Sequence, residues 1–566
     1  MPEQPDTPST THLVVGVTGH RKLRDADIDR VKEQVRAFFL DLQARYPETP
    51  LLLLSPLAEG ADGLVADVAF ELGLRVIAPL PLPVELYRED FDEPGARERF
   101  EQRLARAEVL VLPLHEDGLG SPAVPGAARD RQYAEAGFFV SRHCHVLLAL
   151  WDGRDQESLG GTSHVVRFHL HGDLPGQISH RPAALNLLGI DENTLVRHIP
   201  VSRRVAPQQD NTEPRWLTSR DGVHTGDAVP EAFDRMFRNQ ADFNADIDKY
   251  ADEIDQERRR SGQAPGCPIH RLFMAADWMA RTYQQRVARV LRVTYVLAAA
   301  TGAAFILYAH VHSQDAMIYL YLLLFGAGVI LAMLARRREW HRKYLDYRAL
   351  AEGLRVQSYW RRSGVVDIAN PSHANENFMQ EQDVELGWIR NVMRAANLEG
   401  LLAPMRAAEP EVDAVIDEWI GTSRSDGQLR YFTVTAAKRA RHHRQAEFLG
   451  HASLALGIGI SVILALFAHQ WGHDTKTVLV VAMGLLSVGA GVHEAYAHKK
   501  ADKELVKQYR FMERIYGGAR RRLDTATTVE EKREILRVLG EAALAEHAEW
   551  TLMHRERPLE HTRLGG

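Results

Sequence analysis

Apolar residues are not spread evenly along the chain, because four uncharged stretches gather in its second half. The stretch 316–335 (AMIYLYLLLFGAGVILAMLA) has no charged residue over twenty positions, which at about 1.5 Å per helical residue spans a hydrocarbon core of roughly 30 Å. The stretches 293–309, 452–468 and 477–492 are also uncharged, and the short connectors HVHSQD and HQWGHDTK join the four in pairs. This pattern predicts two transmembrane helical hairpins, although the second pair is short and glycine-rich and also fits buried helices of a soluble bundle.

Basic residues flank the two hairpins at their outer ends. Around the first hairpin they are Arg281, Arg286, Arg289, Arg292, Arg336, Arg337, Arg338, Arg342 and Lys343, and around the second they are Lys438, Arg439, Arg441, Arg444, Lys499, Lys500 and Lys503. The connectors between the spans contain a single lysine or arginine, which is Lys476. By the positive-inside rule, the ends of both hairpins and the N- and C-termini are expected in the cytoplasm. We therefore expect a multi-pass protein of the cell inner (cytoplasmic) membrane.

The two hairpins resemble copies of one unit. Tyr347 and Arg348 lie twelve residues after Ala335, and the pair Tyr509 and Arg510 lies twelve residues after Ala497. Glycines within the spans would let helices approach closely. Because four spans rarely enclose a water-filled path alone, we expect a homo-oligomer.

The first half of the chain alternates short apolar runs with amphipathic stretches. Strands are predicted within 12–19, 75–83, 107–114 and 145–153, and helices within 25–46, 97–106 and 130–142. The stretch 51–73 is predicted to form a strand, a turn and a helix. This alternation predicts an α/β domain, a Rossmann-like parallel sheet with helices on both faces, followed by the all-α membrane domain of two hairpins. Ligands of such sheets bind at the carboxyl ends of the strands.

Three glycine-containing loops follow predicted strands and supply the candidate ligand-binding residues. These are Thr18, Gly19, His20 and Arg21 after the first strand, Ser55, Ala58, Glu59, Gly60, Ala61 and Asp62 after the second, and Trp151, Asp152, Gly153, Gly160, Gly161 and Thr162 after the fifth. Glycines let backbone amides approach an anion, and Arg21 can bind phosphate through its planar guanidinium. Asp152 suits a ribose hydroxyl and Trp151 a stacked base, although a tight turn and a core position explain these two residues equally well. The chain has no complete GxGxxG or Walker motif.

Composition narrows the classes of partner. The formal net charge of -6 provides no basic field and argues against nucleic acid. The two cysteines, Cys144 and Cys267, form neither a disulfide framework nor a metal cluster, and the histidine pairs lack the spacing of a zinc site. The polar, proline-rich stretch 1–11 is expected to be a disordered tail rather than a signal peptide.

Several motifs carry a family resemblance. GVTGHR, SPLAEGADGLVADVA, YAEAGFFVSRHCHVLLALWDG and GGTSHVVRF together resemble the SLOG superfamily of Rossmann-like proteins over residues 12–205. RKYLDYRALAEGLR and ALAEHAEWTLMHRERP in the second half resemble the SLATT family of two-helix membrane effectors, although this chain has two hairpins rather than one. The resemblance implies a sensor of a nucleotide-derived signal that gates a pore or ion channel in bacterial antiphage or stress conflict systems.

An enzyme is the alternative, because the SLOG superfamily includes the LOG nucleoside monophosphate phosphoribohydrolases. Those enzymes share PGGxGTxxE, whose final glutamate acts on the ribosyl bond, and LGGTSHVV places Ser163, His164 and Val165 where that glutamate would fall. Glu59 and Glu135 are also explained as surface charges. We therefore expect no catalytic residue, no metal, and no cofactor other than a nucleotide or nucleotide-derived ligand.

These features suggest a division of the chain. It comprises the tail at 1–11, a ligand-sensing domain at 12–205, a linker with one helix at 206–265, a first two-helix membrane unit at 266–364, a cytosolic connector at 365–435, and a second membrane unit with a C-terminal cytosolic helix at 436–566. Ligand binding is expected to bias the membrane bundle through the helices around Tyr347 and Tyr509.

Overall fold

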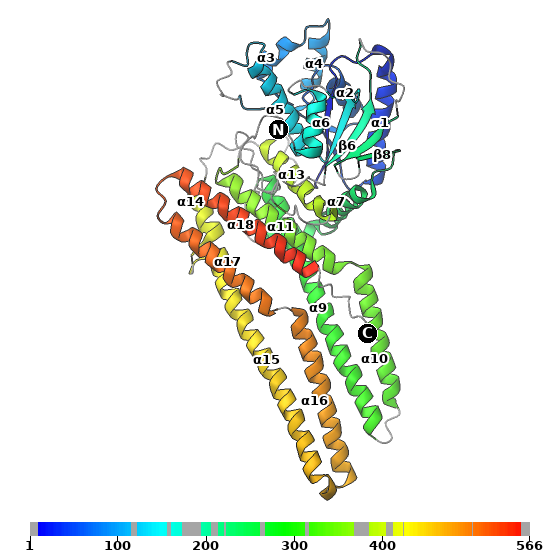
Figure 1. The fold of residues 1–566 in the computed structure, drawn as a ribbon, viewed down its shortest axis with the longest axis vertical. Coiled ribbons are helices and arrows are strands. Elements are labelled where there is room, and N and C mark those ends of the chain that lie inside the picture. Colours follow the sequence, from blue (N-terminus) through cyan, green and yellow to red (C-terminus); the bar gives the residue numbers. More distant parts are fainter. Residues whose placement is uncertain are drawn as a thin grey trace. The chain divides into compact units, whose positions relative to one another are not determined.

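The computed structural model describes residues 10–114, 121–155, 160–172, 194–204, 213–219, 222–260, 267–311, 316–366, 378, 384–402, 411–422, 424–500 and 502–555. The chain divides into two compact units. The first unit comprises Met1–Ala276 and Leu350–Pro410, and the second comprises Asp277–Ala349 and Glu411–Gly566. A sheet with helices forms the first unit, and the described elements of the second unit are all helices, which confirms the predicted fold class (Figure 1).

The first unit is built on an eight-stranded sheet of order β4-β3-β2-β1-β5-β6-β7-β8. Its strands are β1 (Leu13–Gly19), β2 (Leu51–Leu54), β3 (Arg75–Leu80), β4 (Glu108–Val111), β5 (Val146–Trp151), β6 (Leu195–Pro200), β7 (Arg215–Thr218) and β8 (Gly222–Thr225). The first six strands are parallel, and β7 and β8 pair antiparallel to their neighbours. Because β2 and β5 lie on opposite sides of β1, the strand order reverses between β1 and β5, which is where parallel sheets bind ligands.

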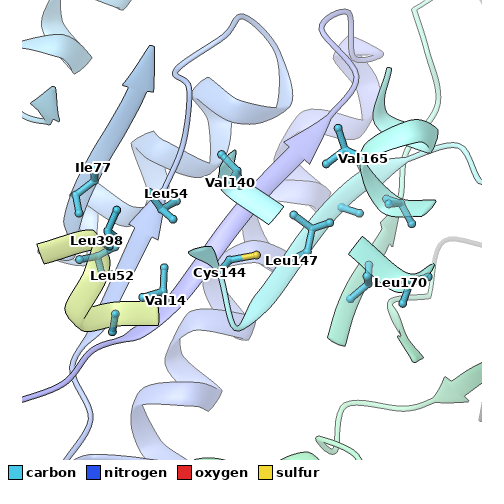
Figure 2. Close-up of a cluster of buried hydrophobic side chains, with 14 of the residues drawn as sticks. Val14, Leu52, Leu54, Ile77, Val140, Cys144, Leu147, Val165, Leu170 and Leu398 are labelled. Atoms are coloured by element: carbon cyan, nitrogen blue, oxygen red, sulfur yellow. The ribbon is translucent and has the colours of Figure 1, made fainter. Parts of the chain in front are cut away.

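Helices cover both faces of this sheet. They are α1 (Ile28–Arg45), α2 (Ala61–Glu71), α3 (Val84–Tyr87), α4 (Ala96–Leu104), α5 (Ala127–His143), α6 (Thr162–His171), α7 (Glu231–Lys249), α8 (Ala251–Arg260) and α13 (Gly387–Leu402). On one face, Val14, Leu52 and Leu54 share a buried core with side chains of α5, α6 and α13. Figure 2 shows Leu398 of α13 among these strand side chains. On the opposite face, α2 packs on β1 and β3, and α1 packs on α2.

The stretch 206–265, expected to be a linker, contributes to the fold of the first unit. Its described residues form β7, β8, α7 and α8. Asn244 of α7 is fully buried, and its side-chain amide accepts from the Thr11 N–H at 2.9 Å and donates to the Thr11 and Glu48 carbonyls at 2.9 and 3.0 Å. One helix was predicted in this stretch, and α7 lies at its position. Buried polar side chains attach α7 to the sheet because the backbone groups before β1 and after α1 need partners.

The second unit contains long helices with exposed apolar surfaces. Its helices include the continuation of α9 (Pro268–His310), α10 (Ala316–Arg337), the start of α11 (Trp340–Arg362), α14 (Val412–Val415), α15 (Gln428–Phe467), α16 (His473–Lys500), α17 (Asp502–Leu523) and α18 (Val529–Arg555). Among the described residues, four helical segments are long and apolar enough to cross a membrane, namely Pro268–His310, Ala316–Arg362, Gln428–Phe467 and His473–Leu523. Leu323 and Leu466 are each 69 % exposed, as expected for side chains that face lipid.

Small residues bring the two hairpins together at α9 and α16. A Cβ added to Gly302 would lie 2.6 Å from Val488, and one added to Gly484 would lie 3.2 Å from Ile306. The Tyr295 hydroxyl donates to the Ala495 carbonyl at 3.1 Å. Glycine therefore permits the close approach of α9 and α16.

The two hairpins share one order of elements. In each, a long helix is followed by a returning helix and then by a third that packs against the first. Tyr347 of α11 packs edge-on against Tyr283 of α9 at 5.6 Å between ring centroids, and Tyr509 of α17 packs against Phe432 of α15 at 5.8 Å. The two Tyr-Arg pairs found in the sequence thus begin with tyrosines in corresponding positions.

Candidate ligand-binding site

The three predicted loops converge at the carboxyl ends of β1, β2 and β5. Thr18 and Gly19 end β1, and Thr18 and Gly19 pair with Ala149 and Leu150 of β5. The loop after β2 leads into α2 at Ala61, and the loop after β5 leads towards α6 at Thr162. Loops far apart in the sequence therefore meet where the sheet order reverses.

Two glycines of the first two loops are needed for this convergence. A Cβ on Gly19 would overlap the Ala61 Cβ and lie 2.7 Å from the Leu150 carbonyl oxygen. Gly60 has φ +86°, and its Cβ would overlap the Arg21 carbonyl. Any larger side chain at these positions would push the loops apart, so the need for glycine is explained by backbone packing.

His20 and Asp152 join the loops after β1 and β5. The Asp152 N–H donates to His20 Nε2 at 3.1 Å, and the same nitrogen lies 3.3 Å from Asp152 Oδ1. Burial lowers the pKa of His20, and the Asp152 carboxylate opposes this shift. Arg203 Nε lies 3.4 Å from Asp152 Oδ2. Arg203 was not predicted from the sequence, because its partners come from loops more than fifty residues away.

Trp151 and Asp152 have partners within the protein. Trp151 is 9 % exposed, belongs to the buried core cluster of the sheet, and donates from Nε1 to the Arg154 carbonyl at 3.0 Å. Asp152 Oδ1 accepts from the Arg154 N–H at 3.1 Å, and Gly153 has φ +77°. These contacts form the tight turn and the core position that the sequence left open.

The loop after β2 is held by its own hydrogen bonds. The Ser55 hydroxyl donates to the Asp62 carbonyl at 3.2 Å and accepts from the Leu57 N–H at 3.2 Å. At the start of α2, the Ala61 N–H donates to the His20 carbonyl at 3.1 Å and the Gly63 N–H donates to the Ala58 carbonyl at 3.0 Å. Two amides of the first turn of α2 are therefore already used by the chain. The Glu59 carboxylate lies 3.5 Å from Arg99.

The side chain of Asp62 is buried beside Arg21. Asp62 is 9 % exposed, and its Oδ1 has no hydrogen-bond partner among the described residues. Burial raises the pKa of Asp62 to about 7, while the positive charge of Arg21 acts in the opposite direction. A carboxyl of this kind can accept a hydrogen bond or exchange a proton near neutral pH.

Two tyrosines complete this polar cluster. The Arg21 guanidinium lies over the Tyr133 ring at 4.7 Å, and the Tyr133 ring centroid is 6.1 Å from that of Tyr87. The Tyr133 hydroxyl is buried and has no partner within the described part of the chain, whereas the Tyr87 hydroxyl donates to the Pro56 carbonyl at 3.2 Å. Neither tyrosine was predicted, because α3 and α5 carry them and neither follows a strand end within the three loops.

The N-terminus of α6 is the start of a helix without an acidic first turn. Gly161 caps α6, and its carbonyl accepts from the His164 and Val165 N–H groups at 2.9 and 3.1 Å. Gly160 has φ +75°, and a Cβ there would lie 3.0 Å from the Ala134 backbone, beside Tyr133. Ser163, His164 and Val165 are buried, and burial lowers the pKa of His164. The first turn of α6 contains no acidic residue, whereas that of α2 contains Asp62, so the start of α6 suits an anion better than the start of α2.

Comparison with family models, with curated proteins and with solved structures gives no match. We therefore interpret the site from its own residues. Among the described residues, no group of three His, Cys, Asp or Glu side chains is placed to hold a metal ion.

Proposed function

We propose that this protein is a membrane effector in which a cytosolic SLOG-type domain binds a nucleotide-derived signal and gates a pore or ion channel formed by its SLATT-type helices. In this proposal the protein is a homo-oligomer of the bacterial inner membrane, has both termini in the cytoplasm, and acts in antiphage or stress conflict systems. One observation carries the proposal. A single chain combines convergent loops at the reversal point of a parallel sheet with four helices able to cross a membrane.

The chemistry of the loops supports a phosphorylated ligand. The amides at the start of α6 and the exposed Arg21 guanidinium both favour an anion. The chain has no net positive field that would favour a polyanion such as nucleic acid. A small phosphorylated molecule is the ligand that these features suit best.

The packing of the first unit supports a route for coupling. The Asn391 carbonyl of α13 accepts from His145 Nε2, before β5, at 2.9 Å, and α13 also contacts α5, which carries Tyr133. A Cβ added to Gly400 of α13 would lie 3.0 Å from Ile269 of α9, and the Gly400 carbonyl accepts from Arg361 of α11. Both α9 and α11 have residues in the two units. A ligand with higher affinity for one arrangement of the loops would therefore shift the populations of the helices continuous with the membrane spans.

Vesicle leakage tests this function. The full chain is reconstituted in dye-loaded vesicles and exposed to a panel of nucleoside monophosphates, pyrophosphate and cyclic nucleotides. We expect leakage with at least one nucleotide, its loss in Arg21→Ala, and its retention in Arg97→Ala, which changes an exposed arginine of α4.

Other outcomes would contradict the proposal. Release of a free base without leakage would support the hydrolase instead. Leakage independent of every ligand, or a full chain that stays monodisperse in buffer without detergent, would also overturn it.

A further inference from the structure

We propose that Asp62 and Tyr133 recognise the sugar hydroxyls of the ligand, while the start of α6 and Arg21 bind its phosphate. This inference rests on the proposed binding of a phosphorylated molecule. It adds that the molecule is a sugar phosphate, and that the protein binds its hydroxyls through different residues from those that bind its phosphate. It assigns ligand recognition to the Asp62 carboxyl, which has no stated role in the proposed function.

The buried carboxyl of Asp62 needs a hydrogen-bond donor. Its Oδ1 is shielded from solvent and lacks a hydrogen-bond partner among the described residues, a condition that destabilises a folded protein. The carboxyl does not serve as the helix cap, since Gly60 occupies that position. Ser55 bonds to the backbone carbonyl of Asp62 rather than to its side chain. A bound donor would satisfy the oxygen that the fold leaves unpaired.

The surroundings favour a hydroxyl over a phosphate at this position. An ionised carboxylate only accepts hydrogen bonds, and it would repel a phosphate at the same place. The Ala61 and Gly63 amides of α2 are occupied by the chain and do not offset that repulsion. Sugar hydroxyls, by contrast, can donate to a carboxylate such as that of Asp62 and accept from a phenol such as that of Tyr133.

Tyr133 connects the two parts of the proposed site. Its ring is covered by Arg21, and its neighbour Ala134 lies against Gly160 at the start of α6. The Tyr133 hydroxyl is buried and unpaired within the described residues, as Asp62 Oδ1 is. One ligand could therefore contact an anion-binding helix start and a hydroxyl-binding carboxyl.

Arg21 and Tyr87 interact electrostatically with Asp62, and Asp90 and Tyr133 are in turn neighbours of Tyr87. Arg21 follows β1, Tyr87 ends α3, Asp90 ends the turn Arg88–Asp90, and Tyr133 lies in α5. Arg21 favours the ionised form of Asp62, whereas Asp90 accepts from Arg129 at 2.9 Å. Since the ionised carboxylate accepts a stronger hydrogen bond than the protonated acid, hydroxyl recognition should strengthen as the pH rises through the Asp62 pKa of about 7.

Three probes separate the two parts of the site. The affinities of AMP, 2′,3′-dideoxy-AMP and pyrophosphate are measured by calorimetry on the full chain in detergent. Wild type should prefer AMP over its dideoxy analogue about 10- to 100-fold, the range for hydrogen bonds to a charged group. Because both nucleotides carry the same titrating phosphate, the change of this ratio with pH reports on Asp62 alone.

Matched variants decide the outcome. Asp62→Asn and Tyr133→Phe should each reduce the preference for AMP while leaving pyrophosphate affinity unchanged, and Asp62→Asn should also remove the pH dependence of the ratio. Asp67→Asn, on the same helix and paired with Arg103 at 2.7 Å, should leave all three affinities unchanged. Tyr133→Phe removes only an unpaired hydroxyl, so it keeps the test valid if Asp62→Asn fails to fold.

Two results would overturn the inference. If wild type binds pyrophosphate but binds AMP and dideoxy-AMP equally, or if both site variants keep the preference, Asp62 does not read a hydroxyl and the anion site alone stands. If none of the three probes binds, the inference fails together with the proposed ligand class.

Discussion

Asp62 makes the stability of the first unit depend on pH. An aspartate has a pKa near 3.8 in the unfolded chain, and burial raises that of Asp62 to about 7 in the fold. Between these values the folded state holds a proton that the unfolded state has lost, so stability falls as the pH rises from about 4 to about 7 and then levels off. At about 1.4 kcal/mol per unit, the loss reaches at most roughly 4 kcal/mol.

Asp62→Asn should remove this dependence, because asparagine carries no titrating proton. We expect the melting temperature of the variant to exceed that of wild type increasingly from pH 5 to pH 8, measured by thermal unfolding of the full chain in detergent. A constant difference between the two proteins across this range would show that the carboxyl is ionised throughout.

The Ser55 side chain stabilises an unfavourable backbone conformation at Leu57. Leu57 is fully buried with φ +60°, a region that costs a non-glycine residue about 1 kcal/mol or more. The Ser55 hydroxyl accepts the Leu57 N–H, so Ser55→Ala should reduce the free energy of unfolding by about 1–3 kcal/mol. Denaturant unfolding measures the change.

Ser121→Ala is the matched control for Ser55. The Ser121 hydroxyl accepts from the Ala123 N–H at 3.3 Å in the same local pattern, but at an exposed position. Its replacement should change stability by no more than about 0.5 kcal/mol. Equal effects of the two substitutions would contradict the role assigned to Ser55.

Among the elements, the strands that the sequence predicts are those with uninterrupted apolar runs. β1, β2, β3, β4 and β5 all fall within predicted runs, whereas β6, β7 and β8 do not. β6 contains Arg197 and His198, both buried. Arg197 pairs with Asp227 at 2.5 Å and lies over Trp216, and His198 contacts the Trp151 carbonyl at 3.0 Å. Polar residues in a buried strand depend on distant partners that a local pattern does not contain.

The candidate site was only partly predictable, because some of its residues also depend on partners that are distant in the sequence. Glycines and charged residues directly after strands identify the loops, and the parallel sheet brings these loops together. Tyr133 and Arg203 lie outside those loops, and their contacts with Arg21 and Asp152 depend on the packing of other elements. Local patterns therefore locate the edge of the sheet but do not identify every residue that meets there.

The helix α13 completes the core of a sheet that begins almost four hundred residues earlier. Leu398 is 1 % exposed among strand side chains (Figure 2). Leu398→Ala should therefore lower the free energy of unfolding of the first unit by about 2–5 kcal/mol, because the cavity cannot close fully. Loss of the tryptophan fluorescence signal in denaturant measures this change.

Leu40→Ala provides the control for Leu398. Leu40 lies on α1 and is 48 % exposed, so its truncation removes little buried surface and should cost less than about 1 kcal/mol. If Leu398→Ala were equally mild, α13 would not belong to the core of the sheet.

At the scale of the whole molecule, the first test concerns the membrane. Cysteine labelling can establish the topology because burial raises the pKa of Cys144 to about 12 and keeps its thiol unreactive. In a Cys267→Ser background, Gly472→Cys in the second connector should react with an impermeant maleimide in intact cells. Glu530→Cys, in the first turn of α18, should react only after permeabilisation.

Reaction of both cysteines from the same side would contradict the predicted hairpin. Both positions are exposed, so a difference in labelling reflects the membrane rather than burial. A full chain found in the soluble fraction would contradict the membrane location itself.

The last test concerns communication along the chain. Asp277 of α9 and Arg348 of α11 pair at 3.2 Å, within two residues of the positions where these helices pass from one unit to the other. The pair joins the two helices there, and Asp277 also pairs with Arg281 of its own helix at 3.0 Å. If both helices transmit the effect of a ligand, Asp277→Asn and Arg348→Gln should each reduce nucleotide-dependent vesicle leakage by about two- to fivefold, the size expected for a partly exposed ion pair.

A double-mutant cycle isolates the role of this pair. Because each single change already breaks the ion pair, the double variant should leak no less than either single one, and all three should bind nucleotide as wild type does. Asp426→Asn with Arg430→Gln, which breaks an exposed pair of 2.7 Å between the residue two before α15 and its first turn, should leave leakage unchanged. Additive losses would show that the two residues act separately, and a loss of binding would place their effect in the first unit. Normal leakage in every variant would mean that the signal does not depend on α9 and α11 moving together.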